Sequence, residues 1–180
     1  MANKVLRKPN LFLKEMAMDA EATKLKVGLV PPETAAGMSG LDLLNAMIAG
    51  RLPGPPIMQT LDFTLTEVEH GRALFEGHPA FQHYNPLGTV HGGYAATLLD
   101  SCMGCAVHTT LPKGVTYTTL EFKVSLVRAI TKDTGVVRAE GKLLNGGRRT
   151  ATAEGRLTDA SGRLLAHGTT TCLIFDIPTK

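Results

Sequence analysis

Hydrophobic and polar residues alternate along two neighbouring stretches in the first half of the chain. Residues 61–69 alternate with a period of two, which predicts a strand that buries one of its faces. The turn signal His70-Gly71 follows, and residues 72–78 then predict a second strand. We therefore expect two consecutive strands here.

The same alternation returns after residue 114 and predicts four more strands. They are expected over residues 116–130, 134–144, 148–159 and 163–175. Turn signals separate them at Lys132-Asp133, Asn145-Gly146-Gly147 and residues 159–162. Asn-Gly is the strongest of these signals for a tight hairpin.

One long helix is predicted between the second and the third strand. It opens at His91-Gly92-Gly93 and carries apolar residues on nearly all sides, which is typical of an enclosed helix. A sheet must bury one face, and this helix is the long element available to cover it. The order predicts an α+β fold in which an antiparallel sheet wraps around one long central helix. Its long edge strands are expected to pair with a second copy of the chain.

The residues before the first strand divide into two parts. Residues 1–38 are expected to be an N-terminal extension, with a short amphipathic helix within 11–26 that Pro31-Pro32 prevents from continuing. Residues 39–180 are expected to form one domain. Ser39 is a suitable N-cap for a short helix that ends near Gly50.

Composition and charge exclude several classes of protein. A net charge of +3 is too small to indicate nucleic-acid binding. The first residues lack the apolar run of a secretory signal, and no segment is apolar enough to predict a membrane span. Three cysteines indicate a reducing compartment rather than a disulfide-linked domain. We expect a cytoplasmic protein that binds neither nucleic acid nor membranes.

Two glycines at the predicted helix start are the first candidate for chemistry. Gly92 and Gly93 let another group approach the backbone closely, and N–H groups in a first helical turn have no partner within the helix. With the helix dipole of roughly half a positive charge, they can polarise a carbonyl oxygen that gains negative charge. Alternatively, the glycines only relieve crowding at a tight junction.

Asp100 is the one charged residue in this apolar helix. Burial of an unpaired carboxylate is costly, so either Thr97, Ser101 or the backbone holds it, or it has a function. His91 and Asp100 lie ~13 Å apart along one helix at about 1.5 Å per residue. An antiparallel helix of a second chain would bring Asp100 beside the other chain's Gly92. A site that contains both residues therefore lies between two chains.

Residues 83–100 resemble the motif of the PaaI-type hotdog thioesterases, a family named for phenylacetate degradation. The resemblance is carried by Asn85, Gly88, the run Val90-His91-Gly92-Gly93, and Asp100, and similar flanking segments extend it over residues 39–175. It implies the hotdog fold and hydrolysis of an acyl-CoA thioester without a metal or organic cofactor. It also implies a homodimer, often paired into a homotetramer.

The resemblance assigns roles to five residues. The Gly92 amide would polarise the thioester carbonyl, and Asp100 of the other chain would act as nucleophile or as general base on water. Asn85 would hold the attacking water or the substrate. His91 would support the helix start or the thiolate leaving group. Thr119 stands where some relatives place a Ser or Thr beside the catalytic acid.

Further residues are expected to bind substrate. Gly93, Leu87 and Tyr94 lie next to the motif and are expected to contact the substrate. Thr118 neighbours Thr119, and a shift of one residue in the strand phase would exchange the two.

Arg148 and Arg149 follow the Asn-Gly-Gly turn and could bind the phosphates of CoA, although solvated strand ends are an equal alternative. Arg128-Ala129 stands where the family commonly has Arg-Pro, which leaves the end of that strand open. Cys102 and Cys105 have the spacing of a redox or zinc pair, but without a second pair of ligands we expect no metal site.

Two other functions compete with hydrolysis. A hotdog module could bind an acyl-CoA or a related ligand without catalysis, but such a module has no need for a carboxylate in its central helix. A hotdog dehydratase needs an Asp and a His together in a hydratase loop, and the sequence has no such pair.

Overall fold

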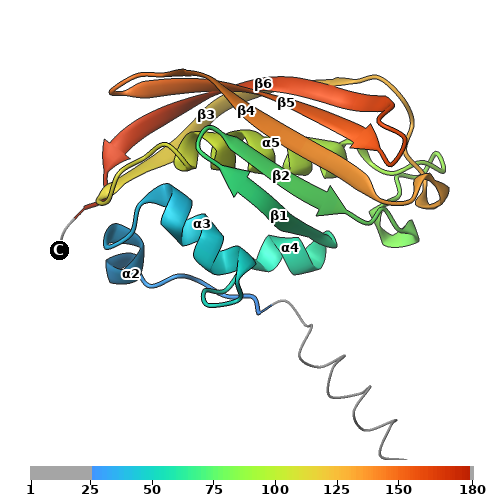
Figure 1. Ribbon diagram of the computed structural model, residues 1–180. Helices are drawn as coiled ribbons and strands as arrows, with labels where there is room; N and C mark the ends of the chain where they lie inside the picture. The colour runs from blue at the N-terminus through green and yellow to red at the C-terminus, as the bar shows by residue number, and fades with distance from the viewer. Residues whose placement is uncertain (1–25, 179–180) are drawn as a thin grey trace, which may run out of the picture.

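The structure, a computed structural model, describes residues 26–178 and contains a curved sheet, one long helix and a layer of short helices (Figure 1). The sheet has six strands in the order β1-β2-β4-β5-β6-β3. The strands are β1 (Phe63–Glu69), β2 (Arg72–Gly77), β3 (Val115–Leu126), β4 (Val137–Gly146), β5 (Thr150–Asp159) and β6 (Leu164–Asp176). All neighbours pair antiparallel. The predicted two strands before the helix and four after it are confirmed.

Two tight turns lie where the sequence signals predict them, and the third begins later than predicted, since Asn145 and Gly146 are the last residues of β4 and pair with Thr152 and Ala151. Gly71 between β1 and β2 and Gly162 between β5 and β6 have φ values of 80° and 82°, a conformation that glycine adopts without strain. Between β4 and β5, the Gly147 N–H donates to the Thr150 carbonyl at 2.9 Å. Asp159 closes the β5–β6 turn by accepting hydrogen bonds from the N–H groups of Ser161 and Arg163.

The long helix α5 (Gly92–His108) lies along the inner face of the sheet and contacts all six strands. Leu98, Leu99 and Met103 are completely buried. At Gly141 on β4, a Cβ atom would lie 2.1 Å from the Cys102 carbonyl oxygen, so a side chain at this position would separate helix and sheet. The predicted enclosed central helix is confirmed.

Two short helices, α3 (Gly40–Ile48) and α4 (Pro56–Thr60), lie on the side of α5 away from the sheet (Figure 1). We call them the cap. Ser39 is the N-cap of α3, as predicted, and its hydroxyl accepts the Asp42 N–H at 3.2 Å. The Gly40 N–H donates to the Leu111 carbonyl at 3.0 Å, which joins the start of α3 to the segment after α5.

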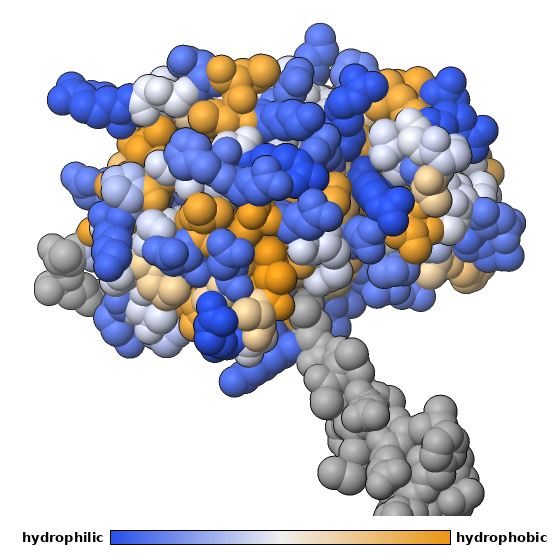
Figure 2. Space-filling model, in the orientation of Figure 1, coloured by the Kyte–Doolittle hydropathy of each residue, from blue (hydrophilic) through white to orange (hydrophobic). Residues whose placement is uncertain are grey.

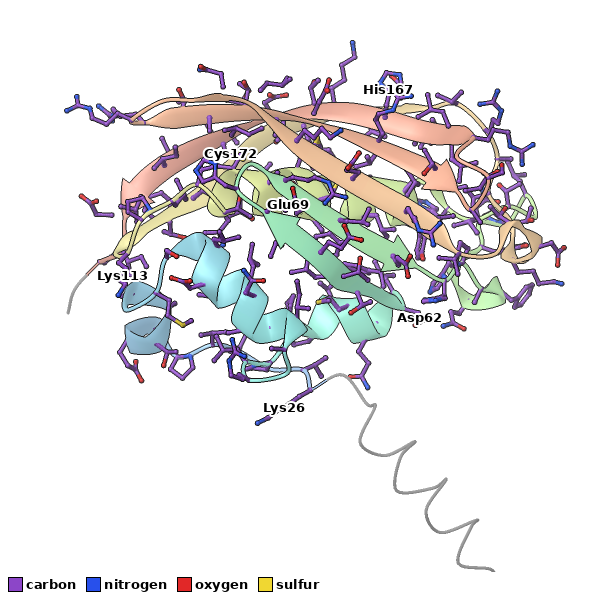
Figure 3. All side chains as sticks on the ribbon, in the orientation of Figure 1. Lys26, Asp62, Glu69, Lys113, His167 and Cys172 are labelled. Atoms are coloured by element: carbon purple, nitrogen blue, oxygen red, sulfur yellow. The ribbon has the colours of Figure 1, made fainter. Side chains whose placement is uncertain are left out.

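The chain before α3 packs against the cap. Residues 26–30, which we call the N-terminal strap, are held by Gly54, whose N–H donates to the Lys26 carbonyl at 2.8 Å and whose carbonyl accepts the Gly28 N–H at 2.9 Å. Figure 3 shows Lys26 beneath the cap. The strap falls within the predicted extension, whose boundary at residue 38 stays a prediction. The helix predicted within residues 11–26 lies, apart from Lys26, outside the described residues.

One short helix was not predicted, and one strand ends earlier than predicted. Pro32 begins the short helix α2 (Pro32–Ala36), because proline fits the first helical position, where its missing N–H would have no partner. The strand expected to reach residue 130 ends at Leu126. There the N–H groups of Val127 and Arg128 both donate to the Leu165 carbonyl, so the regular ladder stops. Within residues 26–178, no helix has the length and apolar character needed to cross a membrane.

Candidate functional site

The Asp100 carboxylate accepts a hydrogen bond from Thr119, with 3.0 Å between Thr119 Oγ1 and Asp100 Oδ1. Asp100 lies in α5 and is partly exposed, and Thr119 comes from β3. Thr97 does not hold the carboxylate, because its hydroxyl donates to the Gly93 carbonyl instead. No described residue donates to Asp100 Oδ2. One carboxylate oxygen is therefore oriented, and the other is open to a water or a substrate.

Only one of the two neighbouring threonines faces Asp100, and a β-bulge follows it directly. The pairing of β3 with β6 shifts between Thr119 and Glu121, and the Thr170 hydroxyl donates to the Glu121 carbonyl at 2.7 Å and stabilises this irregularity. The side chain of Thr119 faces α5. Thr118 is exposed, as expected for neighbouring residues of a strand. Of the two sequence candidates, Thr119 is the one that contacts the carboxylate.

Asp100 and Thr119 line a cavity of about 370 Å³. Ser101, His108 and Tyr117, from α5 and β3, are further polar residues of its wall, and Thr64 of β1 is another. The rest of the wall is mostly apolar and comes from the cap, the strap and strands β1 and β2, with Leu43, Leu44, Met47, Met58, Phe63 and Phe75. The cavity thus joins a polar wall to an apolar one.

Cys105 also lines this cavity, but its thiol is protonated at neutral pH. Burial, with a smaller contribution from the Asp100 carboxylate, raises the pKa of Cys105 to about 12. Burial likewise raises the pKa of the Cys102 thiol. Neither thiol is a nucleophile at neutral pH, because the thiolate is the reactive form.

The pair Cys102-Cys105 is not part of a metal centre in the described part of the chain. Among residues 26–178, no group of three or more His, Cys, Asp or Glu side chains is arranged to hold a metal ion. The only polar partner that the structure gives Asp100 there is Thr119.

The start of α5 presents a backbone amide. His91 is the N-cap, and its Nδ1 accepts the Gly93 N–H at 2.9 Å. The Gly92 N–H donates to none of the described residues. A Cβ atom at Gly92 would lie 2.6 Å from Leu126 Cδ1, so glycine lets this side chain pack directly on the helix start. Of the two predicted amides, that of Gly92 is open and that of Gly93 is occupied.

Asn85 organises the loop before α5. Its Oδ1 accepts the N–H groups of Leu87 and Thr89 at 2.8 and 3.3 Å, and its Nδ2 donates to Thr89 Oγ1 at 2.9 Å. Gly88 in the same turn has a φ of 86°. An amide nitrogen carries two donors, so one Nδ2 hydrogen of Asn85 has no partner among the described residues.

Asn85, His91 and Gly92 line a second cavity, of about 220 Å³, which shares no residue with the cavity of Asp100. Gly92 and Asp100 are also separated by eight residues of one helix, or ~12 Å at about 1.5 Å per residue. The structure therefore brings the predicted residues together in two groups, and a single chain does not join the groups.

The remaining predicted residues lie apart from both groups. Tyr94 is 3% exposed and stacks on His83, with 4.7 Å between the ring centroids. Leu87 is 88% exposed at the tip of its loop. Arg148 and Arg149 line a separate surface hollow that also includes Asp176. Neither Tyr94, Leu87 nor the two arginines lines a cavity with Asp100 or Gly92.

Several residues of the first cavity were not predicted to belong to the functional site. Ser101, Cys105 and His108 follow Asp100 in α5 at spacings of three and four residues from one another, and Tyr117 lies two residues before Thr119, on the same face of β3. Once Asp100 and Thr119 are placed in the site, these spacings in the sequence indicate the other four residues. The contribution of the cap and the strap has no comparable local signal.

Comparison with known proteins confirms the resemblance stated from the sequence. The sequence profile of the Thioesterase superfamily matches residues 87–166, a range that includes Gly92, Asp100 and Thr119. The comparison with curated proteins gave no match.

Solved structures agree with this result. A phenylacetic acid degradation-related protein from Ralstonia eutropha JMP134 is 28% identical, with a TM-score of 0.66 over 72% of this chain and 98% of that chain. A mutant of the phenylacetic acid degradation protein PaaI from Thermus thermophilus is 28% identical, with a TM-score of 0.59 over 66% and 97% of the two chains.

A thioesterase from Haemophilus influenzae has the same fold at 16% identity, with a TM-score of 0.66 over 86% and 97% of the two chains. The fold of this protein is the hotdog fold, and the chain resembles the PaaI-type thioesterases.

Proposed function

We propose that this hotdog chain, which matches the Thioesterase superfamily over residues 87–166, hydrolyses an acyl-CoA thioester to a free acid and CoA. The observation that carries the proposal is the Asp100 carboxylate, oriented by Thr119 at the polar wall of an apolar cavity. A carboxylate in this setting can act on water or on a carbonyl carbon, and an apolar acyl group can fill the space beside it.

The proposed reaction begins with polarisation of the thioester carbonyl. The open Gly92 N–H at the start of α5 donates to the carbonyl oxygen, and the positive end of the helix dipole stabilises the negative charge that develops there. His91 keeps this turn in place through its bond with the Gly93 N–H. Alternatively, His91 supports the thiolate leaving group.

Asp100 supplies the attacking group in one of two ways. As a general base it removes a proton from water, and the hydroxide oxygen bonds to the carbonyl carbon while the carbon–sulfur bond breaks. As a nucleophile it first forms an anhydride with the acyl group, which water then hydrolyses. In both routes CoA leaves as a thiolate and takes up a proton. The free hydrogen on Asn85 Nδ2 is suited to hold the water or the substrate.

The site is proposed to be shared between chains. Because α5 keeps Gly92 and Asp100 ~12 Å apart at about 1.5 Å per residue, one chain cannot place both on the same carbonyl. A two-fold dimer with antiparallel helices forms two equivalent sites, each with Gly92 from one chain and Asp100 from the other. A tetramer built from two such dimers keeps the same sites.

The proposal includes no metal and no organic cofactor, because an amide donor and a carboxylate suffice for the hydrolysis. CoA enters as part of the substrate. Arg148 and Arg149 are the proposed partners of its phosphates. We also retain cytoplasmic localisation as part of the proposal.

The experiment measures thiol release from a panel of aliphatic and aromatic acyl-CoAs by wild type and by Asp100→Asn. We expect turnover by wild type and a loss of about 10²- to 10⁴-fold in kcat for the variant, the usual contribution of a general base. Asp133→Asn is the matched control, since Asp133 is 79% exposed and lines neither cavity. Thermal unfolding of all three proteins checks that the fold is intact.

Near-wild-type activity in Asp100→Asn would show that the carboxylate has no catalytic role. No turnover of any thioester by wild type, together with saturable binding of acyl-CoA, would favour the non-catalytic binding module instead.

A further inference from the structure

The cavity that contains Asp100 is bounded by residues from far apart in the chain. Its polar wall comes from α5 and β3, and part of its apolar wall comes from the N-terminal strap. Gly28, Leu29 and Val30 of the strap take part in this wall, together with residues 53–55 after α3. The strap precedes residue 39, where the sequence resemblance to the thioesterases begins.

The strap is fixed at this position by backbone bonds. The two hydrogen bonds with Gly54, at 2.8 and 2.9 Å, make a short parallel bridge between Val27 and Gly54. Hydrogen bonds between backbone groups depend little on the side chains of the residues that form them. The side chains of the strap can therefore vary in size while the backbone remains next to the cavity.

The cavity wall at and beside the strap is apolar. Leu29 is 85% exposed and Ile48 is 39% exposed, and both line the cavity. Figure 2 shows apolar surface immediately beside the first described residues. A charged or strongly polar acyl group would find few partners here. A hydrocarbon chain would bury its own surface and that of these residues.

We propose that this cavity binds an apolar acyl chain and that the N-terminal strap limits the length of the chain it accepts. The inference rests on the proposed function in one respect, since it takes the thioester carbonyl to lie at Asp100. The acyl chain then runs from the polar wall, between α5 and the cap, towards the strap. The substrate class is a thioester of a hydrocarbon acyl group that ends before the strap.

The expected signature is a length profile with a limit. Each additional methylene buried in the cavity contributes about 0.8 kcal/mol, which corresponds to roughly fourfold in kcat/KM at about 1.4 kcal/mol per tenfold. The value of kcat/KM should therefore rise with acyl length until the chain meets the strap. Longer chains lose this gain because they displace the strap or remain in water.

The experiment varies the strap and measures kcat/KM for straight-chain substrates from butanoyl-CoA to hexadecanoyl-CoA. Val30→Trp adds bulk to the strap wall of the cavity and should lower the ratio of long-chain to short-chain kcat/KM by at least about tenfold, the value of two to three methylenes. Val30→Ala removes bulk from the same wall and should move the optimum to a longer chain. The two variants shift the profile in opposite directions, so a general loss of stability cannot imitate the result.

Ile57→Trp is the matched control. Ile57 lies in α4 next to Met58, is 46% exposed and does not line the cavity. It adds the same indole to the cap without entering the space, and the length profile should stay that of wild type.

Binding of free decanoate, measured by titration calorimetry, separates this inference from the proposed function. We expect Val30→Trp to weaken decanoate binding at least about tenfold and Ile57→Trp to leave it unchanged. If wild type hydrolyses acyl-CoAs but both Val30 variants keep its length profile and its affinity for decanoate, the role of the strap is refuted while the thioesterase activity stands. If wild type hydrolyses no thioester but binds decanoate in a Val30-dependent way, the cavity assignment stands and the hydrolase does not.

Discussion

The start of α5 and its middle supply two different kinds of chemistry. At the start, the open Gly92 N–H is a backbone donor, and the loop around it is held by contacts between residues close in sequence, such as those of Asn85 with Thr89. In the middle, Asp100 is a side-chain acceptor, and its partner Thr119 lies 19 residues away on an edge strand. We call the Gly92 amide with its loop the local half of the proposed site, and the Asp100–Thr119 pair the tertiary half, because only the pair depends on contacts between distant parts of the chain.

This difference shows how the two halves can be tested separately. The carboxylate can be removed by a single side-chain substitution, whereas the amide is lost only when the backbone N–H itself is removed. Both halves lie on one helix, but their cavities do not meet within a chain. The comparison therefore predicts that each half can be inactivated independently and that the two defects can complement each other.

After Asp100→Asn, the largest expected effect comes from Gly92→Pro, which removes the amide donor. Gly92 is the first residue of α5, where proline is tolerated, and His91 has φ −59° and ψ 137°, values suited to a residue before proline. We expect kcat to fall about 10²- to 10³-fold, as for loss of an oxyanion donor. Steady-state kinetics with the best acyl-CoA substrate measures the change.

Gly92→Ala is the control for this substitution. It introduces the same contact of the new Cβ with the Leu126 side chain but keeps the N–H. A variant with alanine that is as inactive as the one with proline would assign the loss to packing rather than to the amide.

Mixed dimers test whether the two halves come from different chains. Neither Asp100→Asn nor Gly92→Pro should be active alone, but a dimer with one chain of each kind has one intact site. Random mixing of equal amounts yields heterodimers as half of all dimers, so about a quarter of the wild-type activity should return. Activity is measured after co-refolding, with differently tagged chains to verify the heterodimer. Verified heterodimers without activity would contradict the shared site.

Thr119→Val probes the tertiary half alone. It keeps the shape of the side chain but removes the hydroxyl that donates to Asp100 Oδ1. A hydrogen bond to a charged group contributes about 1.5–3 kcal/mol, and we expect kcat/KM to fall about tenfold or more. Thr119→Ser, which keeps a donor, should recover most of the activity. Thr118→Val examines the other strand phase, and a larger effect there than at Thr119 would reverse the assignment.

The smallest effect concerns stability at the start of α5. Burial lowers the pKa of His83, partly opposed by Asp62, and its carbonyl accepts the His91 N–H at 2.7 Å. The folded protein then binds fewer protons at this site than the unfolded chain, so stability falls as pH drops below the unfolded value of about 6.5. Thermal unfolding near pH 7.5 and near pH 5.5 measures this loss.

His83→Phe keeps an aromatic ring against Tyr94 and removes the titrating group. The loss of Tm on acidification should be smaller in this variant than in wild type. Some loss of Tm should remain in the variant, because burial also lowers the pKa of His108, the last residue of α5. An equal loss in wild type and variant would mean that His83 does not couple protonation to folding.

Signals along the chain were sufficient to predict the strands, the turns and the central helix. Period-two alternation and the apolar segment after His91 are signals between residues close in the chain, and the structure confirms both. The Asn-Gly-Gly signal is confirmed only in its last residue, because Asn145 and Gly146 still belong to β4 and the turn begins at Gly147. The helix-start glycines and the lone carboxylate were visible for the same reason, as was the resemblance to the thioesterases. Their catalytic roles stay predictions.

Which groups meet in space could be learned only from the folded chain. The folding of β3 beside α5 brings the Thr119 hydroxyl to Asp100. The backbone of the strap bonds to Gly54, which follows α3 in the chain. Likewise, Tyr94 became a buried partner of His83. The physical reason is that a local sequence pattern indicates only which residues are buried and where the chain turns. Contacts between distant residues depend on strand register and on backbone hydrogen bonds. Many different side chains of the right polarity are compatible with the same register and bonds, so the sequence pattern does not specify them.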